Sequence, residues 1–108
     1  MAALLSEPTY KVKLCVGVKP PPEWTAPYAN TIRKGNSKKD SGFDLFVPED
    51  VILPPGEITL INMFVRCAVY KNGEPCPFYM YSRSSTPIKY GLILANSVGI
   101  IDCGYRGP

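Results

Sequence analysis

The sequence of 108 residues contains no histidine, and this absence narrows the chemistry open to it. A general base that works near neutral pH must then be a carboxylate, a perturbed lysine or cysteine, or a metal-bound hydroxide. The four cysteines, Cys15, Cys67, Cys76 and Cys103, include no Cys-x-x-Cys pair. Zinc sites usually combine such pairs with each other or with histidine, so we expect no transition-metal centre.

Long apolar runs are also absent. Met1–Ser6 holds a short apolar run before Glu7 that is too brief for the core of a signal peptide. No run approaches the ~20 residues of a membrane span. Without a secretory signal, the dispersed cysteines are expected to stay reduced. We therefore expect an intracellular protein, in the cytoplasm or the nucleus, with no membrane partner.

The chain has no strong excess of one charge, because 12 Lys and Arg against 9 Asp and Glu leave a net charge of +3. The densest basic group contains Arg33, Lys34, Lys38 and Lys39. It lacks the interleaved aromatic residues and the basic helical pattern that favour nucleic-acid binding. We interpret this group as part of a solvated loop and expect no nucleic-acid partner.

The composition that is present fits one ordinary globular domain over residues 1–108. Hydrophobic residues make up 45% of the chain and charged residues 19%. Twelve prolines and nine glycines favour short strands and many turns. No segment shows a helical period over ten or more residues. The sequence therefore predicts an all-β fold, a sandwich or barrel of short strands.

Alternation of apolar residues with period two predicts strands at residues 10–18, 41–47 and 59–69. Three consecutive prolines end the first of these strands. Residues 19–40 are therefore expected to form a long loop, which Trp24, Pro27 and Tyr28 would pin to the body of the domain.

Turn residues predict how the later strands connect. Pro54–Gly56 suits a tight turn with glycine at a positive φ. Asn72–Gly73 is typical of a type I′ turn, so Phe78–Tyr81 is expected to return as the partner of the strand before it. Leu92–Ala95 and Val98–Ile101 are expected to form the arms of a further hairpin.

Three polar patches carry the candidate chemistry. The first is Ser41–Leu45, where Asp44 is an acid inside a predicted strand. The second is Ser82–Ser85, whose hydroxyls, backbone N–H groups and Arg83 guanidinium could cradle an anion. The third is the segment Leu94–Gly107. It contains an amide, an acid, a phenol and a guanidinium, which belong to Asn96, Asp102, Tyr105 and Arg106.

Each patch has a structural interpretation beside the functional one. The serine-rich patch could satisfy only its own backbone, and Asp44 could be a solvent-facing strand residue. Asp102 could be a turn former, and Tyr105 could be a core aromatic with a satisfied hydroxyl.

Taken together, at this spacing and in this order, the three patches closely resemble the trimeric dUTPase family, the deoxyuridine triphosphate nucleotidohydrolases. The resemblance runs from about Ser41 to Gly107. Its most specific part is Asn96–Gly107, Asn-Ser-Val-Gly-Ile-Ile-Asp-Cys-Gly-Tyr-Arg-Gly, which resembles the uridine-binding and catalytic motif of the family. Ser41–Leu45 resembles its first motif, and Ser82–Ser85 resembles its second.

The resemblance implies a jelly-roll subunit, or distorted β-barrel, that assembles as a homotrimer with active sites shared between subunits. The implied reaction is hydrolysis of dUTP to dUMP and pyrophosphate, with Mg²⁺ as cofactor. This reaction keeps uracil out of DNA and supplies dUMP for dTTP synthesis. Attack on the α-phosphorus requires an in-line water and neutralised phosphate charge, which a carboxylate, a hard cation and N–H donors supply without histidine.

The resemblance also implies roles for single residues. Asp102 would be the catalytic base that orients and deprotonates the attacking water, and Asp44 would hold waters around Mg²⁺. The substrate-binding residues would be Arg83, Ser84 and Ser85 for the phosphates, Asn96, Gly99, Ile100 and Ile101 for uracil, and Tyr105 for deoxyribose.

The sequence ends at Gly107–Pro108, where the family continues through further strands, a fourth motif and a glycine-rich tail that closes over the triphosphate. We therefore expect it to represent the N-terminal part of the family domain, without the C-terminal strands. Two alternatives stay open. One is a dCTP deaminase-like enzyme of the same fold, which shares an Arg-Ser-Ser loop. The other is a non-catalytic nucleotide-binding or regulatory module on the dUTPase scaffold.

Overall fold

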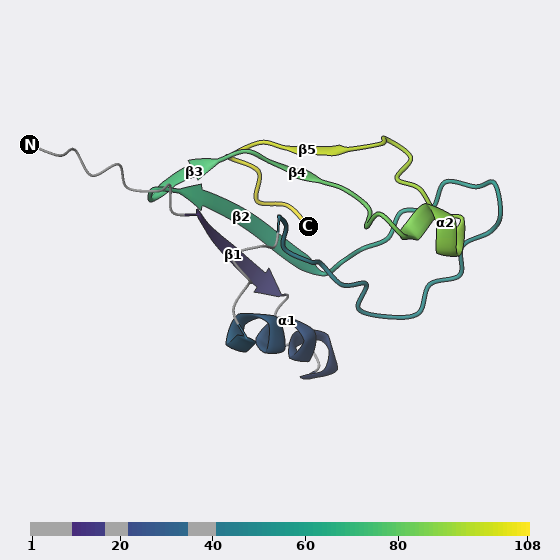
Figure 1. Ribbon diagram of the computed structural model, residues 1–108, viewed down its shortest axis with the longest axis horizontal. Helices are drawn as coiled ribbons and strands as arrows, with labels where there is room; N and C mark the ends of the chain where they lie inside the picture. Colours follow the sequence, from purple (N-terminus) through teal and green to yellow (C-terminus); the bar gives the residue numbers. More distant parts are fainter. Residues whose placement is uncertain (1–9, 17–21, 35–40) are drawn as a thin grey trace, which may run out of the picture. The chain divides into compact units, whose positions relative to one another are not determined.

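The computed structural model describes residues 10–16, 22–34 and 41–108 of the chain (Figure 1). Its strands form two small sheets, one of three strands in the order β1-β2-β3 and one of two strands, β4-β5. The elements in chain order are β1 (Tyr10–Val16), α1 (Pro22–Lys34), β2 (Val65–Lys71), β3 (Glu74–Cys76), β4 (Phe78–Met80), α2 (Thr86–Tyr90) and β5 (Gly99–Ile101).

The strand content confirms the expectation of a mainly β protein in its coarse form. β2 pairs with β3, and β4 pairs with β5, in both cases antiparallel. The strands in the described part of the chain do not close into a barrel. Neither helix within that part is long and apolar enough to cross a membrane.

The chain divides into two compact units. The first combines Met1–Leu14 with Cys67–Gly107, and the second contains Cys15–Arg66 together with Pro108. The first unit therefore holds the paired strands β4 and β5, and the second holds α1 and the segment around Asp44. The expectation of one domain over residues 1–108 stays a prediction.

The predicted Asn72–Gly73 turn is confirmed, but the partner strand expected after it is wrong. Asn72 has φ 50° and Gly73 has φ 83°, the left-handed pair that a type I′ turn requires. The strand that returns beside β2 is β3, in which Glu74 pairs with Lys71. Because Pro77 has no N–H to donate to a ladder, the pairing breaks there and β4 joins β5 instead.

The strand predicted over residues 59–69 begins later than expected, at Val65. Phe64 has φ 53°, and its backbone N–H donates to the Asn62 side-chain oxygen at 2.8 Å. A short-range bond of this kind competes with the extended ladder. The side-chain alternation still holds at the strand start, because Val65 is only 5% exposed whereas Leu60 is 96% exposed.

The loop predicted over residues 19–40 is wrong for Pro22–Lys34, which form α1. Pro22 has the fixed φ that suits the first helical position, and the Glu23 carboxylate in the first turn favours the positive end of the helix dipole. The Thr25 hydroxyl adds a hydrogen bond to the Pro22 carbonyl at 3.0 Å. Pro22, the last of the three prolines expected to end a strand, therefore begins a helix.

The basic group is divided by this helix, because Arg33 and Lys34 are its last residues. Lys38 and Lys39, and also Val18 of the first predicted strand, lie outside the described residues. The expectation of a solvated basic loop is therefore wrong for Arg33 and Lys34 and stays a prediction for the two lysines.

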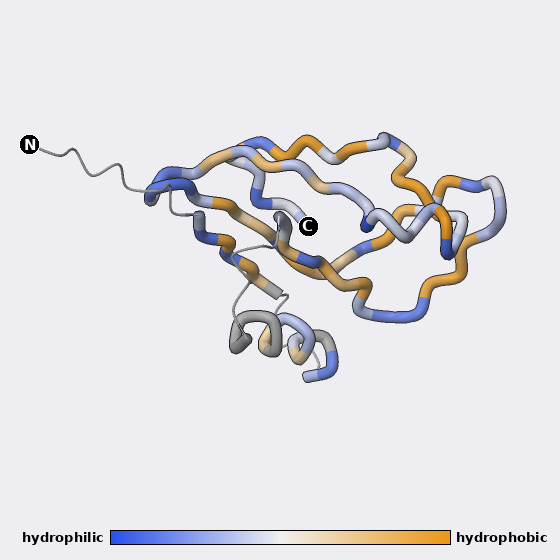
Figure 2. The backbone as a smooth tube through the Cα atoms, viewed as in Figure 1, coloured by the Kyte–Doolittle hydropathy of each residue, from blue (hydrophilic) through white to orange (hydrophobic). Residues whose placement is uncertain are grey.

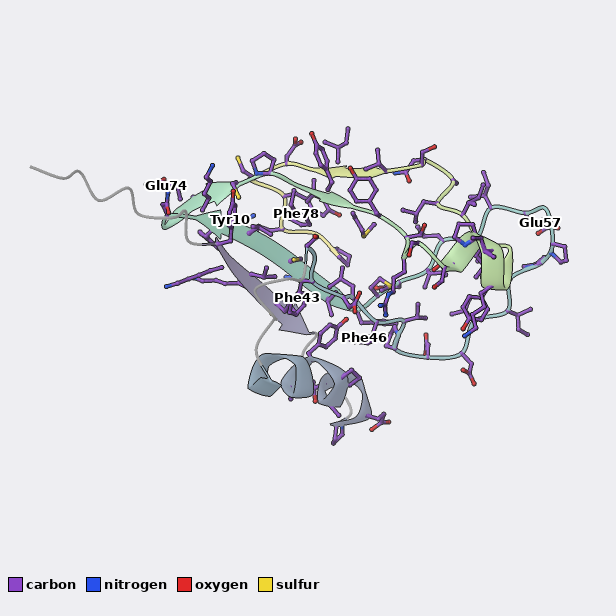
Figure 3. The ribbon with its side chains drawn as sticks, viewed as in Figure 1. Tyr10, Phe43, Phe46, Glu57, Glu74 and Phe78 are labelled. Carbon is purple, nitrogen blue, oxygen red and sulfur yellow. The ribbon has the colours of Figure 1, made fainter. Side chains whose placement is uncertain are left out.

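Tyr28 of α1 holds the segment Ser41–Val47 in place, as expected for an anchoring residue. Its side chain is 5% exposed, and its hydroxyl accepts a hydrogen bond from the Phe46 N–H at 2.9 Å and donates to the Phe46 carbonyl at 3.5 Å. The two rings meet edge to face with centroids 5.2 Å apart. Figure 3 labels Phe46 and its neighbour Phe43 on this segment. The segment itself forms no strand, so the strand predicted over residues 41–47 is wrong.

Hydrophobic residues are spread along the described chain (Figure 2), and many of their large side chains are exposed. Of the hydrophobic side chains described, Tyr28 and Val65 are buried. Five aliphatic side chains are more than three-quarters exposed: Ile52, Ile58, Leu60, Ile88 and Ile93.

We predict that Tyr28→Phe destabilises the protein by about 1–3 kcal/mol, because it leaves the Phe46 N–H without its acceptor in a partly buried place. The midpoint of urea unfolding measures the loss. Tyr79→Phe removes a hydroxyl from a side chain that is well exposed and serves as the control. Equal midpoints for the two variants would show that the Tyr28 hydroxyl does not anchor the segment.

Candidate active site

The β4-β5 pairing sets the positions of the second and third polar patches. Met80 pairs with Gly99 at one end of the ladder and Phe78 with Ile101 at the other (Figure 1). Ser82–Ser85 follow β4 and Asn96 precedes β5, so these residues lie toward the Met80–Gly99 end. Asp102 follows Ile101 and therefore lies at the opposite end.

The Ser82–Ser85 patch leads into a short helix that the sequence did not predict. The Thr86 N–H donates to the Arg83 carbonyl at 2.9 Å, and α2 then runs over Thr86–Tyr90 with proline in its first turn. Ser85 stands at the N-cap position without a side-chain capping bond.

Arg83, Ser84 and Ser85 are all exposed, as a phosphate-binding patch requires. A guanidinium and two hydroxyls offer several donors to phosphate oxygens. The anion cradle expected from the sequence stays a prediction.

A tight turn precedes β5 and places Asn96 on the surface. The Ser97 N–H donates to the Leu94 carbonyl at 3.0 Å, the Val98 N–H donates to the Asn96 carbonyl at 2.7 Å, and Ser97 has φ 64°. The turn is as predicted, but the hairpin around it is wrong, because β5 pairs with β4 and not with residues 92–95.

Gly99 lets β5 approach β4 closely. A Cβ at this buried position would lie 3.2 Å from the Met80 Cβ and 3.3 Å from the Met80 Cε. The two strands therefore lie close together at this pair, and a side chain at position 99 would have to displace Met80.

β5 has one paired edge in the described part of the chain. The sheet that it forms with β4 has two strands, so the other edge of β5 joins no described strand.

Asp102 and Tyr105 are the two ends of one exposed turn, closed by the Tyr105 N–H donating to the Asp102 carbonyl at 3.0 Å. Tyr105 is 47% exposed, which is not the burial of a core aromatic. Its ring lies against Gly107, where an added Cβ would overlap the phenol oxygen and come within 3.0 Å of Cε2. Glycine at position 107 is therefore required for this placement of the ring. The sequence did not predict this role of Gly107. The Tyr-Arg-Gly spacing is the one signal that could have suggested it.

Asp44 belongs to the second compact unit, whereas the other candidate residues belong to the first. Its side chain is exposed, on the segment that Tyr28 anchors through Phe46. Across residues 10–16, 22–34 and 41–108, no group of three or more Cys, Asp or Glu could hold a metal ion. An Asp44 site for Mg²⁺ would thus rely on waters and substrate oxygens for its other ligands, which is the usual manner of this cation.

The cysteines differ in their surroundings. Burial raises the pKa of the Cys67 thiol, which keeps it protonated and unreactive. Cys103, in contrast, is exposed beside Asp102. The thiols have no place in the candidate chemistry.

A profile of the dUTPase family matches residues 29–108, which include all three polar patches. The match covers well over half of the chain, and the chain therefore belongs to the dUTPase family. This finding confirms the resemblance that rested on Asp44, the Ser82–Ser85 patch and Asn96–Gly107.

Relatives named deoxyuridine 5'-triphosphate nucleotidohydrolase occur in bacteria and in a virus. The protein of Lactococcus lactis is 45% identical over 74 residues, which are 68% of this chain and 47% of the relative. The protein of Mycobacterium marinum is 42% identical over 72 residues, 63% of this chain and 42% of the relative. An African swine fever virus protein is 37% identical over 73 residues, with 67% and 44% covered. The chain thus spans less than half the length of these relatives.

We predict that Gly99→Ala destabilises the protein by about 1–3 kcal/mol, because the new Cβ must push β5 away from Met80. Urea unfolding measures the effect. The control is Gly104→Ala, since a Cβ at Gly104 meets no atom within 4 Å. If Gly99→Ala proves as stable as the control, the narrow approach of the two strands is wrong.

Proposed function

We propose that this chain carries the base-reading, water-activating and phosphate-binding residues of a dUTP diphosphatase, which hydrolyses dUTP to dUMP and pyrophosphate. The proposal is carried by the order of three features along the chain. The strand β5 (Gly99–Ile101) has one edge that joins no described strand, the exposed Asp102 follows it directly, and Tyr105 ends the turn that Asp102 begins. Membership of the dUTPase family and the names of the relatives support it.

Uracil recognition follows from the β5 edge. The backbone N–H and C=O groups on the edge of β5 that faces away from β4, with the exposed Asn96 amide, would offer both donors and acceptors to a pyrimidine edge. Uracil presents an N–H between two carbonyls, and cytosine presents a different order of donors and acceptors. Cytosine would therefore leave at least one polar group unpaired, which is unfavourable in a closed site.

Asp102 supplies the acid-base chemistry in the absence of histidine. Its carboxylate would accept a hydrogen bond from the attacking water, orient it toward the α-phosphorus and take its proton. Tyr105 would pack beneath the deoxyribose, where a 2′-hydroxyl would collide with the ring. Arg83, Ser84 and Ser85 would bind the phosphate oxygens.

Magnesium is the cofactor implied by the family, and the residues fit a site of the outer-sphere kind. Asp44 offers one exposed carboxylate, which would hold waters of the hydrated ion while the triphosphate supplies oxygen ligands. When bound, the cation neutralises charge that develops on the phosphates.

In one copy of the chain, the β4-β5 ladder separates the Ser82–Ser85 patch from Asp102. From Gly99 to Asp102 is three residues, about 10 Å along an extended strand, and the Ser82–Ser85 patch lies beyond the Gly99 end. We therefore propose that the phosphate patch of one copy faces Asp102 of another in a homotrimer with shared active sites. The exposed aliphatic side chains agree with such assembly, and the complete subunit would be a jelly roll.

We predict that Asp102→Asn still binds dUTP but hydrolyses it about 10²–10⁴-fold more slowly, because the amide keeps the shape and loses the base. Pyrophosphate release measures the rate. It is measured for this chain and for a chimaera, called the completed chain below, in which the C-terminal half of the Lactococcus lactis relative follows Pro108. Asp50→Asn, at another exposed acid, is the control.

The same assay separates the alternatives. Turnover near that of the parent chain in Asp102→Asn would exclude Asp102 as the base. Release of ammonia from dCTP would identify a deaminase, and binding of dUTP without hydrolysis by either chain would identify a non-catalytic module.

Tyr105→Ala is predicted to lower the preference for dUTP over UTP by about tenfold, because the ring no longer excludes the 2′-hydroxyl. The ratio of kcat/KM for the two nucleotides measures the preference. Tyr10→Ala, at an exposed tyrosine of β1, should leave that ratio unchanged. An unaltered ratio in Tyr105→Ala would remove Tyr105 from sugar discrimination.

A further inference from the structure

Arg106 stands between two residues that the proposed site uses, yet the proposed reaction gives it no part. Its Nη1 atom donates to the Cys103 carbonyl at 2.9 Å and to the Tyr105 carbonyl at 2.6 Å. One guanidinium nitrogen thus bridges two carbonyls of the turn that runs from Asp102 to Tyr105.

These bonds brace an exposed turn. Residues 102–106 are all exposed, and a neutral backbone hydrogen bond in contact with water, such as that from the Tyr105 N–H to the Asp102 carbonyl, contributes only about 1 kcal/mol. Bonds from a charged guanidinium are shorter and stronger than neutral ones. Arg106 therefore adds a restraint to this turn.

The restraint from Arg106 matters because the two ends of the turn would serve different functions. Asp102 begins the turn and Tyr105 ends it, so the conformation of the turn sets the position of the carboxylate relative to the phenol ring. Gly107 completes the arrangement by leaving room for that ring. Opening of the turn would move the water-activating group and the sugar platform independently of each other.

We propose that Arg106 is a positioning residue for the reaction: it acts through the turn and holds Asp102 and Tyr105 in one productive arrangement. The inference rests on the proposed function for its effect on rate, but the brace itself is a property of the free chain. A phosphate-binding role for Arg106 is the competing explanation, because guanidinium groups also bind phosphates bidentately.

The first test measures the brace without any substrate. In Arg106→Ala, hydrogen exchange of the Tyr105 amide should become at least about tenfold faster, while amides of β4 and the urea midpoint stay near those of the parent chain. Arg66→Ala removes an exposed arginine of β2 and should change neither. Equal Tyr105 exchange in Arg106→Ala and the parent chain would overturn the proposal.

The second test measures the consequence for dUTP hydrolysis in the completed chain. Arg106→Ala should lower kcat by about tenfold to a hundredfold, because small misplacements of a reacting group have effects of this size, and should lower the dUTP-to-UTP preference with little change in KM. Arg106→Lys keeps the charge and N–H donors on a flexible stem, so it should recover part of the rate.

The outcomes of the two tests are distinct. A raised KM with unchanged kcat would make Arg106 a phosphate ligand and overturn the positioning role. Absence of dUTP hydrolysis in the parent chain would contradict the proposed function alone, because Tyr105 exchange still decides whether Arg106 braces the turn.

Discussion

The narrow pairing of Gly99 with Met80 is the constraint on which the candidate site depends. It brings β5 close to β4. The same pairing sends the serine patch and the Asn96 turn to one end of the strands and Asp102 to the other. Under the proposed function, a side chain at Gly99 would disturb both the strand that reads uracil and the turn that carries Asp102.

The separation produced by this ladder is the reason for the proposed shared site. A triphosphate needs a base at its α-phosphorus and donors along its other phosphates, but the Ser82–Ser85 patch and Asp102 follow opposite ends of the β4-β5 ladder. In the proposed homotrimer, the phosphate patch of a second copy would meet the Asp102 turn of the first, and the exposed aliphatic side chains would provide surface for such contacts.

The sequence allowed good prediction of local turns. Asn72–Gly73 and the Asp102–Tyr105 turn depend on neighbouring residues alone, and both are as expected. Strand partners were harder, because nothing near Phe78 in the sequence shows that it pairs with Ile101 rather than with β2. The helix α1 was missed because prolines that break a strand also begin a helix, and the strand over residues 59–64 was interrupted by a left-handed Phe64 that no propensity favours.

The most direct test of the shared site is a mixture of two inactive variants, Arg83→Ala and Asp102→Asn, in the completed chain. If one copy supplies phosphate donors and another supplies the base, mixed assemblies contain some sites with intact Arg83 and intact Asp102. The account therefore predicts that refolding the two variants together restores part of the dUTP hydrolysis that neither shows alone. Formation of mixed assemblies with no recovery of hydrolysis at any ratio would contradict it.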